Sequence, residues 1–241
     1  MSQRHIFSKP PLAYRLLRHL GWSTVVGLGL SIFLVILFSV VPPPLSGVMI
    51  ERWLEAKINN KPPPFAYHWR PLAKITPTVG LAAVTSEDQL FANHFGFDWE
   101  AIAKAYEYNQ IHRKLRGAST ISQQTAKNLF LWDGRSWLRK GLEAYFTLLI
   151  EGCWTKQRIL EVYLNIIEFG DGIYGVEAAS QHYFHKTALN LTSNEAALLI
   201  AVLPNPHLLH VDNPSPIVIE RQQWILNNMG RLGGAQYIKN L

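Results

Sequence analysis

The sequence predicts a mostly α-helical protein that is preceded by one membrane-spanning helix. Three observations support this fold class. Residues 20–50 carry no charged side chain, the pattern from Thr76 onward is helical, and few segments alternate strictly between apolar and polar residues as strands do. With 48% hydrophobic and 17% charged residues among 241, the chain can bury a large core, which excludes a disordered protein.

Composition narrows the classes of partner. The formal net charge is +6, from 23 Lys and Arg against 17 Asp and Glu, and it favours an anionic partner. A single cysteine, Cys153, excludes an intramolecular disulfide framework, and the histidines at 182, 185, 207 and 210 lack the spacing of a zinc site. The basic residues belong to no recognisable nucleic-acid-binding motif, so no nucleic acid is expected as a partner. A phospholipid surface and a phosphate-bearing substrate remain.

The first predicted element is a membrane anchor. Residues 21–41 are 21 uncharged residues, and a helix of this length spans roughly 31 Å, which matches a bilayer core of about 30 Å. Four basic residues and no acidic one precede it, so the positive-inside rule places the N-terminus in the cytoplasm. A cleaved signal peptide and a buried core helix are the alternatives. We expect a basic tail at 1–19 and a retained transmembrane helix at 20–42.

Residues 43–76 are interpreted as a membrane-proximal linker or small lobe, because prolines punctuate the segment and it carries Trp53, Phe65, Tyr67 and Trp69. These aromatic side chains suit either the headgroup level of a bilayer or packing against the main domain, which we place at 77–241. Caps, glycines and prolines mark the ends of eight helices in that domain. The predicted helices run from Pro77 to about Ser86, Trp99 to Leu115, Ser119 or Thr120 onward, Trp137 to Gly152, Thr155 to Ile167, Ile173 to Phe184, Thr192 to Pro204 and Ile217 to Leu232.

Glu87 is the first candidate for acid–base chemistry, because it begins the segment EDQLFANHFGFD, in which phenylalanines can desolvate a carboxylate. If the helix from Pro77 ends near Ser86, burial and the negative end of the helix dipole make Glu87 a stronger proton acceptor, as suits a general base. If Ser86 instead caps a new helix with Gln89 completing a capping box, the dipole favours the charged form. A solvated capping carboxylate is the ordinary alternative.

The second candidate is the segment GASTISQQTAKNLF, from 117 to 130. Helical spacing places Thr120, Gln124, Lys127 and Asn128 on one face, with Gln123 beside them, while apolar residues share another face. Such a polar stripe suits a sugar that carries phosphate or carboxylate groups, although many polar helix faces meet only water.

The third candidate is a cluster of cations around one carboxylate. Arg135, Arg139 and Lys140 lie close in sequence, with Glu143 four residues after Arg139 and three after Lys140. Surface ion pairing and a pyrophosphate site both explain this pattern. In the next predicted helix, core packing and ordinary helix-face positions are the interpretation of three residues: Glu161, Tyr163 and Asn165.

Together these segments resemble a known family, the monofunctional biosynthetic peptidoglycan glycosyltransferases of glycosyltransferase family 51, which are related to the first catalytic domain of class A penicillin-binding proteins. Five motifs occur in the family's order and cover about half of the chain. They are EDQLFANHFGFD at 87–98, GASTISQQTAKNLF at 117–130, RKGLE at 139–143, KQRILEVYLNIIEFG at 156–170 with GIYGVEAASQHYF to 184, and LTSNEAALLIAVLPNP at 191–206. The one departure is Leu142, where some relatives carry a cation. Lys186-Thr187-Ala188 lacks the glycine of a penicillin-binding motif, so no such domain is expected.

The resemblance implies a lysozyme-like all-α fold and the polymerisation of lipid II. The 4-hydroxyl of one disaccharide attacks the anomeric carbon of the growing chain and displaces undecaprenyl pyrophosphate with inversion. Glu87 matches the general base, and Glu143 matches a second essential acid on the pyrophosphate side. Residues that match substrate-binding positions are Asp88, Phe91, His94, Ser119, Thr120, Gln123, Gln124, Lys127, Asn128, Arg135, Arg139 and Lys140. No cofactor is required, and a divalent cation, Mg²⁺ or Mn²⁺, is left open.

The same resemblance implies a bacterial inner-membrane protein with a periplasmic catalytic domain. Its expected partners are lipid II, the nascent glycan, the bilayer, and other proteins of cell-wall synthesis or division. A lysozyme-like lytic transglycosylase and a non-enzymatic envelope scaffold are the competing hypotheses. The cations from Lys127 to Lys140 favour synthesis over cleavage, because finished glycan offers no pyrophosphate to neutralise.

Overall fold

The computed structural model describes residues 12–62, 65–112, 117–134 and 136–241, and the chain divides into two compact units, 1–41 and 42–241. In the first unit, α1 (Leu12–Phe38) is one continuous helix. Its apolar stretch has a mean hydropathy of 2.2, and only 6% of the 18-residue apolar window is buried. Its length and composition suffice to cross a membrane, and its low burial argues against a core helix.

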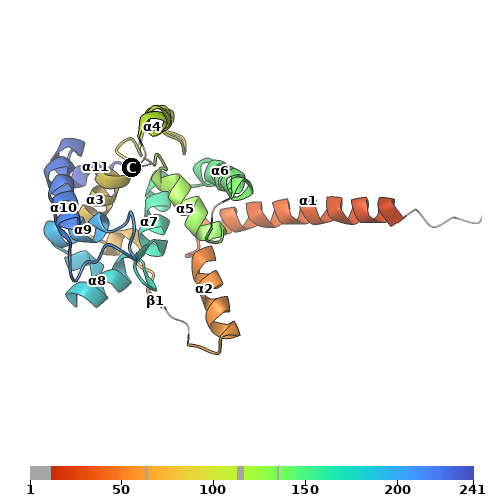
Figure 1. The fold of residues 1–241 in the computed structure, drawn as a ribbon, viewed down its shortest axis with the longest axis horizontal. Coiled ribbons are helices and arrows are strands. Elements are labelled where there is room, and N and C mark those ends of the chain that lie inside the picture. Colours follow the sequence, from red (N-terminus) through yellow and green to blue (C-terminus); the bar gives the residue numbers. More distant parts are fainter. Residues whose placement is uncertain (1–11, 63–64, 113–116, 135) are drawn as a thin grey trace, which may run out of the picture. The chain divides into compact units, whose positions relative to one another are not determined.

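The second unit is mostly helical, as the sequence predicts (Figure 1). Its α-helices are α2 (Gly47–Ile58), α3 (Pro77–Glu87), α4 (Trp99–Ile111), α5 (Ile121–Phe130), α6 (Trp137–Cys153), α7 (Lys156–Ile166), α8 (Val176–Phe184), α9 (Ser193–Ala201), α10 (Pro216–Met229) and α11 (Ala235–Lys239). Three short 3₁₀ helices, η1 (Leu72–Lys74), η2 (Ala188–Asn190) and η3 (Gly230–Leu232), complete the helical part of the described residues.

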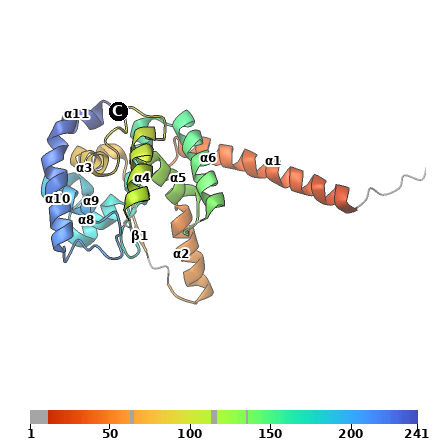
Figure 2. The same ribbon diagram turned by 45° about the horizontal axis from the view of Figure 1, so that its top comes forward.

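Two buried helices organise this unit. Every residue of α3 from Val79 to Thr85 is buried, because the helix is apolar on nearly all faces, and it packs against α9, α10 and α11 (Figure 2). Most of α7 is also buried, and it contacts both α5 and α8. The helices α5 and α6 pack on each other on the far side of α7 from α8 (Figure 1). The carboxyl end of α3 meets the amino end of α5, where the Ile121 N–H donates to the Asp88 carboxylate.

A small three-stranded sheet corrects one sequence prediction. Its strands are β1 (Ala66–Tyr67), β2 (Glu168–Gly170) and β3 (Ile173–Tyr174), in the order β1-β3-β2, with β1 parallel and β2 antiparallel to β3. The predicted helix from Ile173 was wrong at its start, because α8 begins only at Val176. Between them Gly175 has φ +82°, and a Cβ there would lie 2.4 Å from the carbonyl oxygen of Asn165. Only glycine fits this turn.

The segment interpreted as a linker contains α2, which the sequence analysis did not predict. Ser46 caps this helix, since its Oγ accepts a hydrogen bond from the Met49 N–H at 3.3 Å. Its first residue, Gly47, packs so closely on the end of α5 that a Cβ would lie 2.4 Å from the carbonyl oxygen of Leu131. α2 is thus fixed against α5 through backbone contact.

Two helix ends also differ from the prediction. α4 ends at Ile111, and the predicted continuation to Leu115 lies outside the described residues. α10 ends at Met229, and the predicted last turn is the 3₁₀ helix η3. The remaining predicted helices agree with the structure to within a few residues at their ends.

Candidate functional site

Glu87 is the last residue of α3. The helix ends there because Asp88 leaves the helical conformation, with φ −163° and ψ 75°, while its N–H still donates to the Val84 carbonyl at 3.0 Å. Of the two alternatives for this boundary, the one that ends the helix from Pro77 is therefore confirmed. The side chain of Glu87 is 15% exposed, so it is neither a fully solvated cap nor a core group.

Three donors hold the two oxygens of the Glu87 carboxylate. Gln124 of α5 donates from Nε2 to Oε2 at 3.2 Å, and Ser86 donates from its hydroxyl to Oε1 at 2.9 Å. Arg221 of α10 donates from Nη2 to the same Oε1 at 3.3 Å and to the Ser86 Oγ at 2.9 Å. The carboxylate is thus fixed from two sides by groups that all donate to it.

Asp88 occupies a different environment from its neighbour. Its side chain is 1% exposed, and its two oxygens lie 2.8 and 3.0 Å from Nε2 of His94. The Ile121 N–H donates to Oδ2 at 2.9 Å, so Asp88 holds the start of α5 against the end of α3. Phe91 is fully buried beneath the ammonium of Lys156, which lies 4.7 Å from the ring centroid. Neither Asp88 nor Phe91 reaches the surface, so this geometry offers positioning rather than the substrate contact expected for them.

The residues predicted to form the polar face of α5 have two different roles: some cap the helix, and others line a cleft. Thr120 and Gln123 form a capping box and are buried, and the Thr120 hydroxyl donates to the Gly96 carbonyl at 2.6 Å. These two side chains stabilise the start of the helix and do not line the cleft. Gln124, Lys127 and Asn128 do line it. Ser119, which precedes the cap, is exposed.

The cleft has a volume of about 910 Å³ and extends from α5 to α2. Its further lining comes from Arg139, Tyr163, Glu168 and the loop 203–207. Glu87 is not part of this lining. Because Gln124 both lines the cleft and donates to the Glu87 carboxylate, Glu87 lies beside the cleft, one hydrogen bond from a lining residue.

Tyr163 shows how Gln124 is oriented. Its ring is fully buried, and its hydroxyl donates to Oε1 of Gln124 at 3.3 Å, which turns Nε2 of that amide toward Glu87. Burial, followed by the nearby charges of Glu87 and Asp88, raises the pKa of Tyr163 well above its ordinary value, so the hydroxyl keeps its proton. Tyr163 is a core residue, as the sequence predicts, but it also belongs to the site. The buried Asn165 is structural, because it exchanges hydrogen bonds with the Arg70 backbone.

Cations gather near Glu143. This carboxylate is 4% exposed and forms an ion pair with Lys140 at the i,i+3 spacing. Burial lowers the pKa of Lys127, the charge of Glu143 opposes that effect, and the positive charge of Arg139 adds to it. The structure thus brings Lys127, Arg139, Lys140 and Glu143 together. Arg135, the remaining predicted member, lies outside the described residues.

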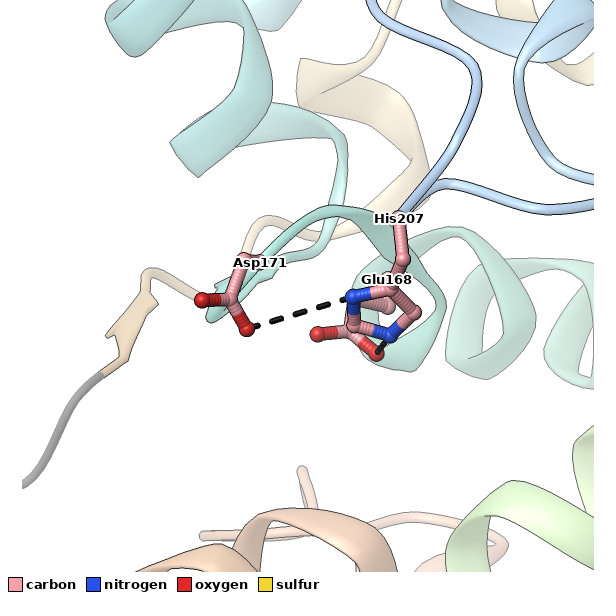
Figure 3. A group of neighbouring side chains, drawn as sticks. All are labelled: Glu168, Asp171 and His207. Carbon is pink, nitrogen blue, oxygen red and sulfur yellow. Dashed lines mark ion pairs between the residues drawn. The ribbon is translucent and has the colours of Figure 1, made fainter.

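A second charged group lies at the α2 end of the cleft and was not predicted. Figure 3 shows His207 facing Glu168 and Asp171, with ligand-type atoms of the three within 4.8 Å of one another. Arg52 of α2 lies 3.2 Å from Glu168 and 2.7 Å from Asp171, and its hydrogen bond lowers the pKa of Asp171. The sequence offered only a weak signal, since Arg52 lies in the segment interpreted as a linker.

The carboxylates in and beside the cleft do not fit a divalent cation, neither Glu168 with Asp171 nor Glu87 and Glu143. At the α2 end, a metal ion bound to Glu168 and Asp171 would face the guanidinium of Arg52, which already pairs with both carboxylates. Glu143 is ion-paired with Lys140, and Glu87 with Arg221. The chain's own cations therefore supply the positive charge at these positions.

Fold and site together define a class: a helical protein with a fixed carboxylate beside a cation-bearing cleft. The family model described as Transglycosylase matches residues 58–230, which is more than half of the chain. The "Biosynthetic peptidoglycan transglycosylase" of Cronobacter sakazakii is 54% identical over 227 residues, covering 92% of this chain and 93% of that protein. Proteins of the same name from Salmonella paratyphi A and Escherichia coli K12 are 53% and 56% identical, over 99% and 85% of this chain and 98% and 86% of theirs. The chain belongs to the transglycosylase family, and its domain is lysozyme-like and helical.

Proposed function

We propose that this protein polymerises lipid II into linear peptidoglycan glycan strands and releases undecaprenyl pyrophosphate. Family membership supports the reaction class, and the observation that carries the mechanism is the Glu87 carboxylate, held by Gln124 at the wall of a cleft with cations further along it. Glu87 takes the proton of the acceptor 4-hydroxyl as its oxygen forms a bond to the anomeric carbon of the donor. The bond from that carbon to the pyrophosphate breaks, and its electron pair leaves with the pyrophosphate.

The cations lie where the leaving group needs them. Lys127 and Arg139 line the cleft, and Lys140 is held beside them through its ion pair with Glu143. Negative charge grows on the pyrophosphate as the bond breaks, and fixed positive charge in a partly buried site stabilises it. In this proposal Glu143 arranges the cations, while Gln124, Asn128 and Ser119 contact sugar or phosphate.

Membrane attachment suits a lipid-linked substrate. We assign 1–19 to a cytoplasmic tail, 20–42 to a single-pass anchor in the inner membrane, 43–76 to a membrane-proximal lobe and 77–241 to a periplasmic catalytic domain. The apolar, exposed α1 supports the anchor. Because lipid II is held by an isoprenoid chain, anchoring the enzyme confines both reactants to one surface and raises their effective concentration.

The test is polymerisation of labelled lipid II by the full-length protein in detergent, beside Glu87→Gln. We expect lysozyme-sensitive polymer from the unchanged protein and a loss of at least about 10²-fold with Glu87→Gln, whose fold is checked by circular dichroism. Polymer at the normal rate from Glu87→Gln would refute the assignment of the base. Cleavage of preformed glycan in place of synthesis would identify a lytic enzyme instead.

A further inference from the structure

Arg221 is a cation that the fold carries to Glu87 from a distant part of the chain. It lies 134 residues after Glu87 in the sequence, in α10. Val218 and Ile225, three residues before and four after Arg221, are both fully buried, and α10 packs on α3. Residues at these spacings share one helix face, so Arg221 lies on the side of α10 that packs against the core.

The contacts of Arg221 form a closed triangle. One nitrogen, Nη2, lies 3.3 Å from Oε1 of Glu87 and 2.9 Å from Oγ of Ser86, while that hydroxyl donates to the same Oε1 at 2.9 Å. Gln124 holds the opposite oxygen. A carboxylate held at one oxygen can still turn about its side-chain bonds, whereas one held at both oxygens keeps its direction.

Other charged and titratable groups near the end of α3 are engaged elsewhere. Asp88 is paired with His94, Glu195 of α9 with Lys186, and the Tyr237 hydroxyl of α11 accepts from the Ala92 N–H. Tyr163 of α7 lies near enough to respond to the charge of Glu87, but its hydroxyl donates to Gln124. Among the described residues, Arg221 is the cation whose ion pair with Glu87 is seen.

We propose that Arg221 is a positioning residue that fixes the direction of the Glu87 carboxylate. The inference rests on the proposed function of Glu87 as base. A general base must be aimed at the proton that it takes. The guanidinium holds one carboxylate oxygen directly, and its contact through Ser86 limits rotation. Arg221 also stabilises the carboxyl end of α3, because its positive charge lies near the negative end of the helix dipole. The loss of Arg221 can therefore lower activity either through Glu87 or through stability, and the measurements below separate these two effects.

The experiment measures kcat, KM for lipid II and the Tm of the full-length protein with Arg221→Met and Arg221→Lys. For Arg221→Met we expect kcat to fall about 10- to 100-fold with KM nearly unchanged. Arg221→Lys recovers only part of kcat, because an ammonium retains the charge without the planar fork.

Arg231→Met is the matched control, since it removes the same charge from an exposed position on η3 and should leave kcat unchanged. A purely structural role predicts an activity loss in proportion to the loss of folded protein, and that result would overturn the proposal. If Arg221→Met does not fold, Arg221→Lys decides: reduced kcat at normal Tm supports the proposal, and full kcat overturns it. Glu87→Gln, run in parallel, reports separately on the proposed function.

Discussion

Glu87 and Asp88 are neighbours in the sequence, yet their side chains have different environments. The helix ends between them, so Glu87 faces Gln124 and Arg221, whereas Asp88 turns inward to His94 and to the backbone of α5. One carboxylate is partly exposed beside the cleft, and the other joins two helices. A change of backbone direction at a single residue is enough to separate the two roles.

Lys127 gives a prediction with a defined pH dependence. Burial lowers its pKa, so it loses its positive charge at a lower pH than an exposed lysine does. Polymerisation should therefore decline toward alkaline pH, and Lys127→Arg should extend activity to higher pH, because a guanidinium stays protonated. Lys127→Met should lower kcat about 10²-fold. Initial rates measured across the pH range test each variant.

Lys104→Met is the control for these measurements. Lys104 forms an exposed ion pair with Glu100 on α4, so its removal should leave kcat and the alkaline limb unchanged. Identical alkaline limbs for the unchanged protein and Lys127→Arg would show that another group titrates there.

The predicted and the missed site residues differ in how far apart they lie in sequence. Gln124, Lys127 and Asn128 could be predicted together, because the periodicity of one helix places them on one face. Arg221 could not, because only the packing of α10 on α3 brings it to Glu87. Thr120 and Gln123 fit the polar face of α5 by their spacing. Because the first turn of a helix leaves backbone N–H groups without partners, these two side chains accept hydrogen bonds from those groups and do not line the cleft.

At the scale of the element, α5 and α9 offer a matched comparison. Each begins with a capping box, formed by Thr120 with Gln123 and by Thr192 with Glu195. Replacing either threonine by alanine should lower the free energy of unfolding by about 1 kcal/mol. Only Thr120→Ala should also lower kcat, about 3- to 10-fold, because a 1 Å shift of catalytic groups is costly and α5 carries Gln124.

Urea unfolding followed by circular dichroism, with lipid II kinetics on the same preparations, measures both effects. Thr120 is the more buried of the two and also donates to Gly96, so the larger loss of stability belongs to Thr120→Ala. An equal loss of kcat in Thr192→Ala would mean that the activity follows general stability rather than the position of α5.

Elements with strong local signals were predicted well, and those without them were missed. The helix of Thr192 has a capping box and a following proline, and it matches α9 closely. The strands β1 and β3 have two residues each, and paired residues lie 107 positions apart in the chain, so no local pattern marks them. α2 was missed because prolines on both sides suggested a linker, although proline only stops a helix and does not prevent one nearby.

At the scale of the molecule, α2 is joined to the rest of the second unit at two places around the cleft. Gly47 of α2 packs on the backbone at the end of α5, and Arg52 of α2 pairs with Glu168 and Asp171 beside β2. The first contact is steric and the second is ionic. Because the Arg52 side chain is 26% exposed, the ionic contact is the one that solvent conditions can weaken.

Arg52→Gln should therefore act on substrate binding. Loss of the ion pairs loosens the α2 wall of the cleft, and we expect KM for lipid II to rise about 2- to 5-fold with little change in kcat. Added salt should raise KM of the unchanged protein toward that of the variant and affect the variant less. Lys104→Gln, in an exposed pair outside the cleft lining, should respond to salt as the unchanged protein does. Equal salt responses in Arg52→Gln and the unchanged protein would contradict a role for this link.

A carboxylate held at both oxygens has a consequence for the polymer itself. A sugar ring carries several hydroxyl groups of similar reactivity, and a base that could rotate would activate more than one of them. Gln124 and Arg221 leave the Glu87 carboxylate one direction, so in the proposed reaction one hydroxyl of each incoming disaccharide loses its proton. The uniform linkage and the absence of branches in the product then follow from three side chains on three helices.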